Sequence, residues 1–375
     1  MKFLHTGDLH LDSAFCSSDV FTSDARREAQ RETLARIIAL AAEEKCEMVL
    51  IAGDLFDGKY VTPETSRFVK ELFEGADMPI IIAPGNHDPY SDGSFYKSES
   101  LPENVYVFSS AELQRYDFDE PDVSVYGYAF TSSVLGSSPL AAHGAEAKDK
   151  RFSLLCAHGD VDSPISRYCP LTEGDISAMG FDYAALGHIH NRGAVNDRVY
   201  YCGFPQGRSF DELGDGGVNI VEISEDGHIS VSRRSVSVEK YETAQVYLDG
   251  SEETAGIIAK IKSAAELLTD GKGTHLRVVL TGNADEAVMP DDETVRQAVC
   301  ECDGILSVDL KNATLPVADA AELRADISIR GAFYNALYSG LIDDDPAVRE
   351  KTALALRIGL SAIEGKRIYG GKDSE

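Results

Sequence analysis

The sequence has few basic residues. Its 375 residues include 35 lysines and arginines against 63 aspartates and glutamates, and the formal net charge is −28. A surface this negative repels nucleic acid and anionic membranes unless bound metal ions or a local basic patch offset the charge. The composition therefore argues against a protein that grips long DNA by its own overall charge.

Long apolar runs and a cysteine framework are also missing. The apolar runs, such as residues 48–52 and 80–83, are far shorter than the roughly 20 residues of a membrane-spanning helix. His5 and Asp8 interrupt the N-terminal segment before a signal-peptide core could form. The seven cysteines are an odd number without disulfide-framework spacing. We therefore expect a cytoplasmic protein with reduced thiols and no membrane contact.

The length and the hydrophobic pattern predict two domains, since a typical domain has about 150 residues. The first half alternates short apolar runs with amphipathic stretches, which is typical of a layered α/β domain. The pattern changes around residue 240, and we place the boundary near Val238, between domains 1–238 and 239–375. The expected strands are 2–6, 48–52, 79–83, 152–157, 182–186, 218–223 and 229–233, and the expected helices include 24–45 and 172–179.

Five short segments with chemically active side chains each follow an expected strand. Binding sites of sheet-based domains form where strands end, so these segments can converge. Carboxylate, amide and imidazole groups together suit manganese, iron or zinc better than calcium or magnesium alone. The segments are Gly7-Asp8-Leu9-His10, the AGDLFD segment with Asp54 and Asp57, Gly85-Asn86-His87-Asp88, Ala157-His158-Gly159-Asp160 and Gly187-His188-Ile189-His190.

Each of these segments alone has a plainer interpretation. An Asp-x-His segment is commonly a loop carboxylate beside a hydrogen-bonded histidine, and Gly-Asn-His-Asp is usually a turn. Their joint occurrence is different, because packing gives no reason for five such segments in a fixed order after apolar strands. Together they predict a metal site.

The ordered set GDxH, GDxxD, GNHD, AHG and GHxH resembles the calcineurin-like metallophosphoesterase superfamily. The segments KFLHTGDLHLDS, VLIAGDLFD and FDYAALGHIHNRG are similar to bacterial DNA repair exonucleases of the SbcD type. The resemblance covers about residues 1–235. It implies an α/β sandwich of two β-sheets flanked by helices, followed by a smaller C-terminal α+β domain that caps the site and binds partners. Leu9 and Asp12 stand where SbcD proteins often carry Trp and Gly, which indicates a related branch.

The resemblance also implies the ligands of two divalent metal ions. Manganese is the expected metal, with iron or zinc as alternatives. The bridging hydroxide that the two ions would hold is the expected nucleophile on a phosphodiester. The first ion would be held by Asp8, His10 and His190, the second by Asn86, His158 and His188, with Asp54 bridging both.

His87 is the histidine of these segments that the resemblance leaves without a metal. We expect it to protonate the leaving oxygen or to stabilise the charge that develops there. Asp57 is the candidate to orient His87 and keep it protonated. Asp88 could serve instead, although a turn carboxylate is an equally good interpretation of it. Arg192 and Arg208 could contact phosphates, or could be solvated surface arginines.

These features predict a two-metal phosphodiester hydrolase. The first hypothesis is an exonuclease of DNA repair, which could also cleave single-stranded DNA as an endonuclease. The alternative is a small-molecule phosphodiesterase or phosphatase with the same metal pair, which the negative charge favours. A third hypothesis is a binding subunit without turnover, against which the intact ligand set argues. The resemblance also implies DNA and an SbcC-like ABC/SMC-type ATPase as partners, and a homodimer is a further expectation.

Overall fold

A computed structural model describes the chain except for residues 16–19, 144–148, 191–192, 317–319, 364 and 366–375. Its contacts divide into two compact units, Met1–Tyr241 and Glu242–Glu375. The expected boundary at Val238 is close to this division, and separate folding of the two parts remains a prediction. None of the helices in the described ranges combines the length and the apolar character that crossing a bilayer requires. Arg192 and Cys16 lie outside the described residues.

The first unit is built on two six-stranded sheets. Strands β1 to β4 run parallel, and β13 and β14 extend that sheet as an antiparallel hairpin beyond β1. In the second sheet β6, β7, β10 and β12 run parallel. The first sheet has the order β14 (Ile229–Ser235), β13 (Gly217–Ile223), β1 (Lys2–Thr6), β2 (Val49–Ile51), β3 (Ile80–Ile82), β4 (Val105–Val107). The second has the order β11 (Gly193–Ala194), β12 (Val199–Tyr201), β10 (Tyr183–Gly187), β7 (Phe152–His158), β6 (Val123–Gly127), β5 (Gln114–Phe118).

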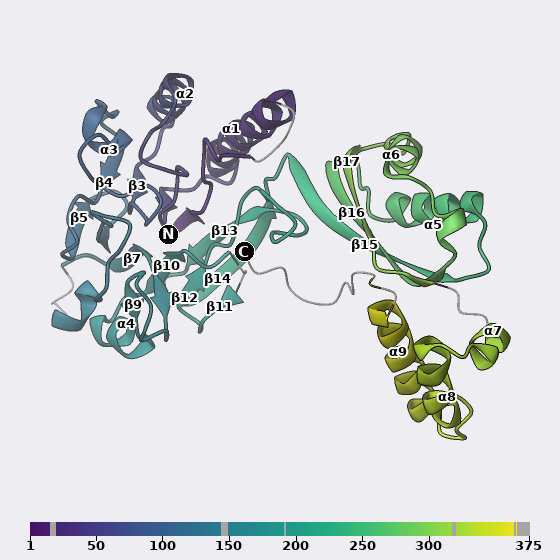
Figure 1. Ribbon diagram of the computed structural model, residues 1–375. Helices are drawn as coiled ribbons and strands as arrows, with labels where there is room; N and C mark the ends of the chain where they lie inside the picture. The colour runs from purple at the N-terminus through teal and green to yellow at the C-terminus, as the bar shows by residue number, and fades with distance from the viewer. Residues whose placement is uncertain (16–19, 144–148, 191–192, 317–319, 364, 366–375) are drawn as a thin grey trace. The chain divides into compact units, whose positions relative to one another are not determined.

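Alternating side chains of these strands build separate apolar layers. Leu50 of β2 packs between the two sheets, together with Leu154 of β7. Its neighbours Val49 and Ile51 face the other way, against the helices α1 (Val20–Glu43) and α2 (Pro63–Glu74), which lie next to each other in Figure 1. This is the two-residue period of a strand that is covered on both faces. The second sheet is covered by α4 (Glu173–Met179), so the unit is the expected sandwich of two sheets flanked by helices. Shorter elements of this unit are α3 (Phe95–Ser98), η1 (Pro139–Ala142), β8 (Asp160–Val161) and β9 (Pro170–Leu171).

Helix ends follow the local sequence signals. Thr62 caps α2 by accepting a hydrogen bond from the backbone N–H of Thr65, and Pro63 occupies the first turn. Thr172 caps α4 in the same way, and Gly180 ends that helix in a left-handed conformation. Asp12 also has a left-handed backbone, with φ of 63°. Its carboxylate accepts a 2.7 Å hydrogen bond from the backbone of Thr62 and ties the first loop to α2.

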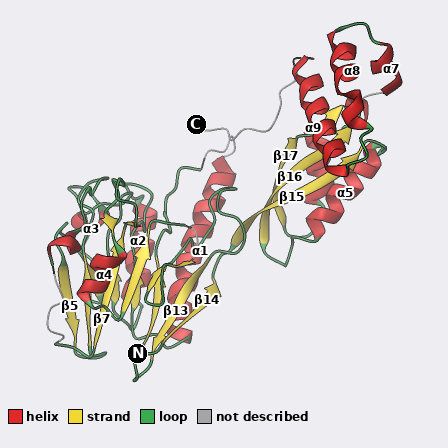
Figure 2. Cartoon of the chain, turned by 90° about the horizontal axis from the view of Figure 1, so that it is seen from below, coloured by secondary structure: helices red, strands yellow, loops and turns green. Residues whose placement is uncertain are grey.

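The second unit is an α+β layer with an added helical group (Figure 2). Its sheet has the order β15–β16–β17, with β18 beside β16. Helices α5 and α6 pack against this sheet through apolar residues such as Ile257 and Val295. Helices α7, α8 and α9 form a separate small core around Leu323 and Tyr334. The strands are β15 (Glu239–Asp249), β16 (Gly273–Ala284), β17 (Ile305–Asn312) and β18 (Leu315–Pro316). The helices are α5 (Thr254–Glu266), η2 (Glu286–Val288), α6 (Asp292–Cys300), α7 (Ala320–Ala325), α8 (Ile329–Leu341) and α9 (Pro346–Ile363).

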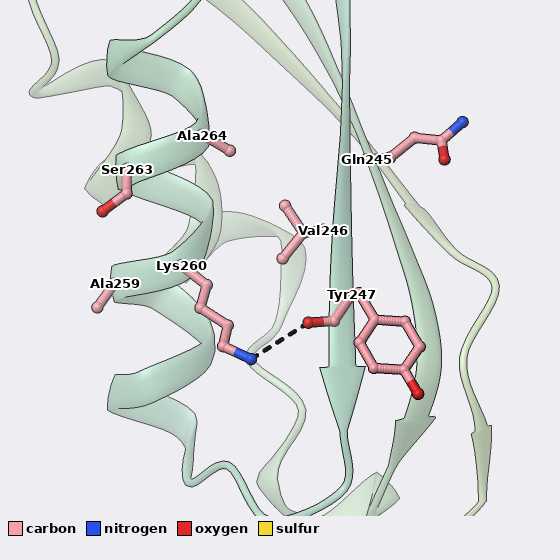
Figure 3. Close-up of a pocket in the computed structure, with 7 residues that line it drawn as sticks. All are labelled: Gln245, Val246, Tyr247, Ala259, Lys260, Ser263 and Ala264. Atoms are coloured by element: carbon pink, nitrogen blue, oxygen red, sulfur yellow. Dashed lines mark hydrogen bonds between the residues drawn. The ribbon is translucent and has the colours of Figure 1, made fainter.

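A groove of about 410 Å³ lies between α5 and the edge strand β15 (Figure 3). Val246 points toward the helix, whereas Gln245 and Tyr247 point away from it, as successive residues of a strand do. Lys260 of α5 donates a 3.2 Å hydrogen bond to the backbone oxygen of Tyr247. The groove therefore holds one basic side chain, which is already engaged, and it carries no cluster of catalytic groups.

Candidate metal centre

The candidate ligands of the first unit follow the carboxyl ends of five parallel strands from both sheets. Four of them have left-handed backbone angles, with φ of 51° at Asp8, 50° at His10, 49° at Asp54 and 99° at His188. Such conformations are rare for residues other than glycine and persist only where surrounding contacts hold them, which is common at functional sites. Asp8 and His10 follow β1, Asp54 follows β2, Asn86 follows β3, His158 ends β7, and His188 and His190 follow β10.

Backbone contacts hold these loops against one another. The N–H of His10 donates to the backbone oxygen of Asp54 at 2.9 Å, so the first two loops run side by side. The buried carboxylate of Asp88 accepts hydrogen bonds from the backbone N–H groups of Leu55 and Gly85, both at 2.8 Å, and from the Tyr96 hydroxyl. Asp88 thus joins the second and third loops. Of its two possible roles, a partner of His87 or a turn carboxylate, these contacts fit the turn carboxylate.

Glycine is required beside the ligands because atoms of neighbouring loops lie directly over the backbone. A Cβ at Gly85 would meet Oδ1 of Asp54 at 2.2 Å. A Cβ at Gly187 would meet the backbone oxygen of Ala52 at 2.0 Å. The glycines of the GNHD and GHxH segments therefore allow the loops to approach each other closely.

Asp54 lies between two groups of imidazoles. Its Oδ2 is 3.3 Å from Nε2 of His158 and 3.7 Å from Nε2 of His10. Its Oδ1 accepts a 2.9 Å hydrogen bond from the backbone N–H of His87. A carboxylate in this position can contact cations on either side, which is what a bridging ligand requires.

The remaining candidate ligands surround Asp8 and Asp54. Nε2 of His190 is 3.8 Å from Oδ1 of Asp8. Nε2 of His158 is 2.9 Å from Oδ1 of Asn86. The His188 ring packs 5.0 Å from the His158 ring, and its backbone N–H donates to Asp8 at 3.0 Å. The structure therefore brings all seven predicted ligands together. Among the described residues, three groups have ligand atoms close enough to share an ion, namely Asp8 with His10 and His190, Asp8 with Asp54 and His158, and His10 with Asp54 and His87.

Burial and charge show that the site fits cations. Nε2 of His10 is buried and has no hydrogen-bond partner in the described part of the chain, and a buried polar atom of this kind normally has one. Burial lowers the pKa of His158, but the carboxylates of Asp54 and Asp8 outweigh burial and raise that pKa to about 9. A buried centre that favours a proton on an imidazole also favours a metal ion, and divalent ions are the cations that this mixture of ligands prefers.

His87 differs from the ligands in its exposure. Its side chain is 47% exposed, and its ring lies 4.7 Å from that of His10. Nδ1 of His87 contacts Oδ1 of Asp57 at 2.8 Å, and this hydrogen bond raises the pKa of His87 despite partial burial. The same Asp57 oxygen is 3.3 Å from Nδ1 of His10. Asp57 can therefore orient both rings, and its catalytic role through His87 remains a prediction.

Two further carboxylates stand behind the imidazoles and were missed by sequence reasoning. Oε1 of Glu212 contacts Nδ1 of His190 at 2.6 Å, and Oδ1 of Asp160 lies 3.6 Å from Nε2 of His188. Asp160 is part of the Ala157-His158-Gly159-Asp160 segment, so its position in a motif was a usable signal. Glu212 lies outside every motif, and no local spacing indicates it. Arg208, one of the two candidate phosphate contacts, donates to Glu212 at 2.9 Å.

The acid stability of the metal-free protein depends on Glu212. Burial raises its pKa, but the hydrogen bond from His190 and the charge of Arg208 outweigh burial and lower the pKa from 4.5 to about 2. The folded state thus takes up this proton only near pH 2, whereas the unfolded state takes it up near pH 4.5. Stability from this group is complete above pH 4.5 and is lost as the pH falls toward 2.

Glutamine cannot take up this proton. Between pH 5 and 2 we therefore expect the unfolding free energy of the wild type to fall by on the order of 3 kcal/mol more than that of Glu212→Gln. The measurement is denaturant unfolding of both proteins in chelator at several acidic pH values. Parallel curves for the two proteins would contradict the assignment.

The chain is similar to several known proteins. A family model described as calcineurin-like phosphoesterase matches residues 1–192. An uncharacterized metallophosphoesterase, YhaO of Bacillus subtilis, is 30% identical over 301 residues, which are 76% of this chain and 73% of that protein. A subunit of the nuclease SbcCD from Staphylococcus epidermidis is 24% identical over 262 residues, 60% of this chain and 66% of that protein. Among solved structures, a dimetal phosphatase from Danio rerio aligns with a TM-score of 0.38 and 12% identity, over 63% of this chain and 96% of that chain.

Proposed function

Because this chain belongs to the calcineurin-like phosphoesterase family and so is a metal-dependent phosphoester hydrolase, we propose that it cleaves phosphodiester bonds of DNA with two divalent metal ions. The observation that carries the proposal is the convergence of the seven candidate ligands around the buried carboxylates of Asp8 and Asp54. DNA as the substrate is supported by the similarity to the staphylococcal nuclease subunit and by the SbcD-like segments that flank the ligands.

The residues of the chain would divide the chemistry as follows. Asp8, His10 and His190 would hold one ion, and Asn86, His158 and His188 the other, with Asp54 between them. When bound, the two ions supply an activated water as nucleophile and neutralise charge on the phosphate. His87, protonated and held by Asp57, would donate its proton to the leaving oxygen at neutral pH. Manganese is the proposed metal, with iron or zinc as alternatives.

The substrate is tested with end-labelled linear DNA. We expect Mn²⁺-dependent shortening from an end that stops when a chelator removes the metal. An Asp54→Asn preparation, purified in the same way, shows whether any residual digestion comes from a contaminant. Turnover of bis(p-nitrophenyl) phosphate or cyclic nucleotides without digestion of DNA would instead support the alternative, a small-molecule phosphodiesterase, which the net charge of −28 favours.

We further propose that DNA is held mainly by a partner, an ABC/SMC-type ATPase, and that the chain can pair with a second copy. The acidic composition supports the first part, a partner that holds the DNA, since nonspecific DNA affinity comes from cationic side chains. We expect the isolated chain to bind a labelled duplex more weakly than about 10⁻⁵ M at physiological salt, within the nonspecific range. Fluorescence anisotropy measures this, and submicromolar binding by the chain alone would contradict it.

A further inference from the structure

We propose that Glu212 and Arg208 form a positioning unit that fixes His190 for the first metal ion and couples it to Asp57. The proposal rests on the proposed two-metal centre and adds residues that lie outside its set of ligands. Oε1 of Glu212 lies 2.6 Å from Nδ1 of His190. The carboxylate accepts only, so Nδ1 carries the hydrogen, and in the neutral imidazole Nε2 keeps its lone pair. That Nε2 is the atom near Asp8, at 3.8 Å.

Glu212 is itself held firmly. Its Oε2 accepts a 2.8 Å hydrogen bond from the backbone N–H of Arg208. Its Oε1 accepts a 2.9 Å hydrogen bond from Nη2 of the same arginine. The side chain of Glu212 is only 6% exposed, so water does not compete for these contacts. A carboxylate with both oxygens engaged cannot rotate away from His190, and this is the usual way in which proteins fix a metal-binding imidazole.

Arg208 extends the arrangement to the other side of the site. Its Nη1 lies 4.0 Å from Oδ1 of Asp57, the oxygen that contacts Nδ1 of both His10 and His87. One guanidinium therefore lies between the two carboxylates that orient three imidazoles. In all three, Nδ1 faces a carboxylate, which leaves Nε2 for the metal ion or the substrate. An arginine can serve here because its planar fork presents several donors in fixed directions.

The arrangement differs from an ordinary surface ion pair. Exposed pairs contribute little and tolerate substitution, whereas loss of a carboxylate behind a ligating histidine typically costs 10–100-fold in metal affinity. Because Glu212 contacts His190 and no other candidate ligand of the set, the loss should fall on one of the two ions. A general structural role would weaken both ions together.

The test is titration calorimetry of the metal-free full chain with Mn²⁺. Glu212→Gln is nearly isosteric, and we expect it to weaken one Mn²⁺ site by 10–100-fold while the other keeps its affinity. Arg208→Lys keeps the positive charge but loses the fork, and a smaller weakening of the same site is expected. Asp211→Asn changes an exposed carboxylate next to Glu212 and should bind as the wild type does.

The outcomes separate the two proposals. Wild-type affinity at both sites in Glu212→Gln and in Arg208→Lys would overturn the positioning unit. Equal weakening of both sites would also overturn it, because the effect would then not pass through His190. A wild-type chain that binds fewer than two Mn²⁺ ions would instead contradict the proposed two-metal function. Electron paramagnetic resonance is the second readout. The wild type should show the spin-coupled signal of a Mn²⁺ pair, and at limiting metal this signal should be reduced in Glu212→Gln.

Discussion

Substitution of Asp54 by asparagine is expected to empty both metal sites and to lower phosphodiester cleavage by about 10⁴-fold. Its Oδ2 faces His158 at 3.3 Å and His10 at 3.7 Å, so a single carboxylate serves both groups of imidazoles. Burial raises the pKa of Asp54, but His158 and His10 outweigh burial and lower it. The carboxylate is therefore charged at neutral pH, and an amide of the same shape cannot replace that charge between two cations.

Elemental analysis of the purified protein and a Mn²⁺ titration measure the loss of metal. Asp92→Asn is a suitable control, because Asp92 is a carboxylate of the same unit that is 91% exposed and is paired with Lys97 at the surface. An Asp54→Asn protein that still holds two Mn²⁺ ions, or that cleaves the substrate at a wild-type rate, would show that Asp54 does not bridge a metal pair.

Substitution of His87 by alanine is expected to lower cleavage by 10²–10⁴-fold while both metal ions stay bound. The side chain is 47% exposed, and its Nδ1 contacts Asp57, so it can hold a proton toward solvent and substrate. This combination separates His87 from the buried ligands. The p-nitrophenolate leaving group needs no proton, whereas an alkoxide leaving group depends on the acid. His87→Ala should therefore lose less activity on a p-nitrophenyl ester than on a substrate with an alkoxide leaving group.

Rates at saturating Mn²⁺ and metal content are measured together for this variant. His228→Ala provides a matched control, because His228 is exposed at the turn between β13 and β14. Loss of a metal ion in His87→Ala would make His87 a ligand, a role that its closeness to His10 and Asp54 permits, and would remove it as the acid.

The strands and the meeting of the candidate ligands were predictable because their signals are local. The apolar run at residues 48–52 has the length of a buried strand, and β2 is buried on both faces. Each candidate segment directly follows a parallel strand of one of the two sheets, and the contacts between the loops bring the segments together. His5 of the first strand lies in the core with its Nδ1 3.0 Å from the Tyr183 hydroxyl. The last helix α9 (Pro346–Ile363) likewise begins at a proline, which suits the first turn of a helix.

Contacts between distant segments were not predictable. Glu212 reaches His190 across a loop in which nothing in the sequence sets it apart from the other acidic residues of the chain. Asp88 was ambiguous because its role depends on which backbone N–H groups turn toward it. Helix α1 begins earlier than the expected residue 24 and ends at Glu43, where the chain turns at Lys45 with φ of 56°. Such ends depend on tertiary contacts as well as on periodicity.

The most direct measurement is anomalous diffraction from crystals of the full chain grown with Mn²⁺. Two peaks are expected about 3.5–4 Å apart, with Asp54 between them, one beside Asp8, His10 and His190 and the other beside Asn86, His158 and His188. A single peak, or peaks away from these seven side chains under saturating Mn²⁺, would contradict the two-metal centre and the hydrolase mechanism built on it.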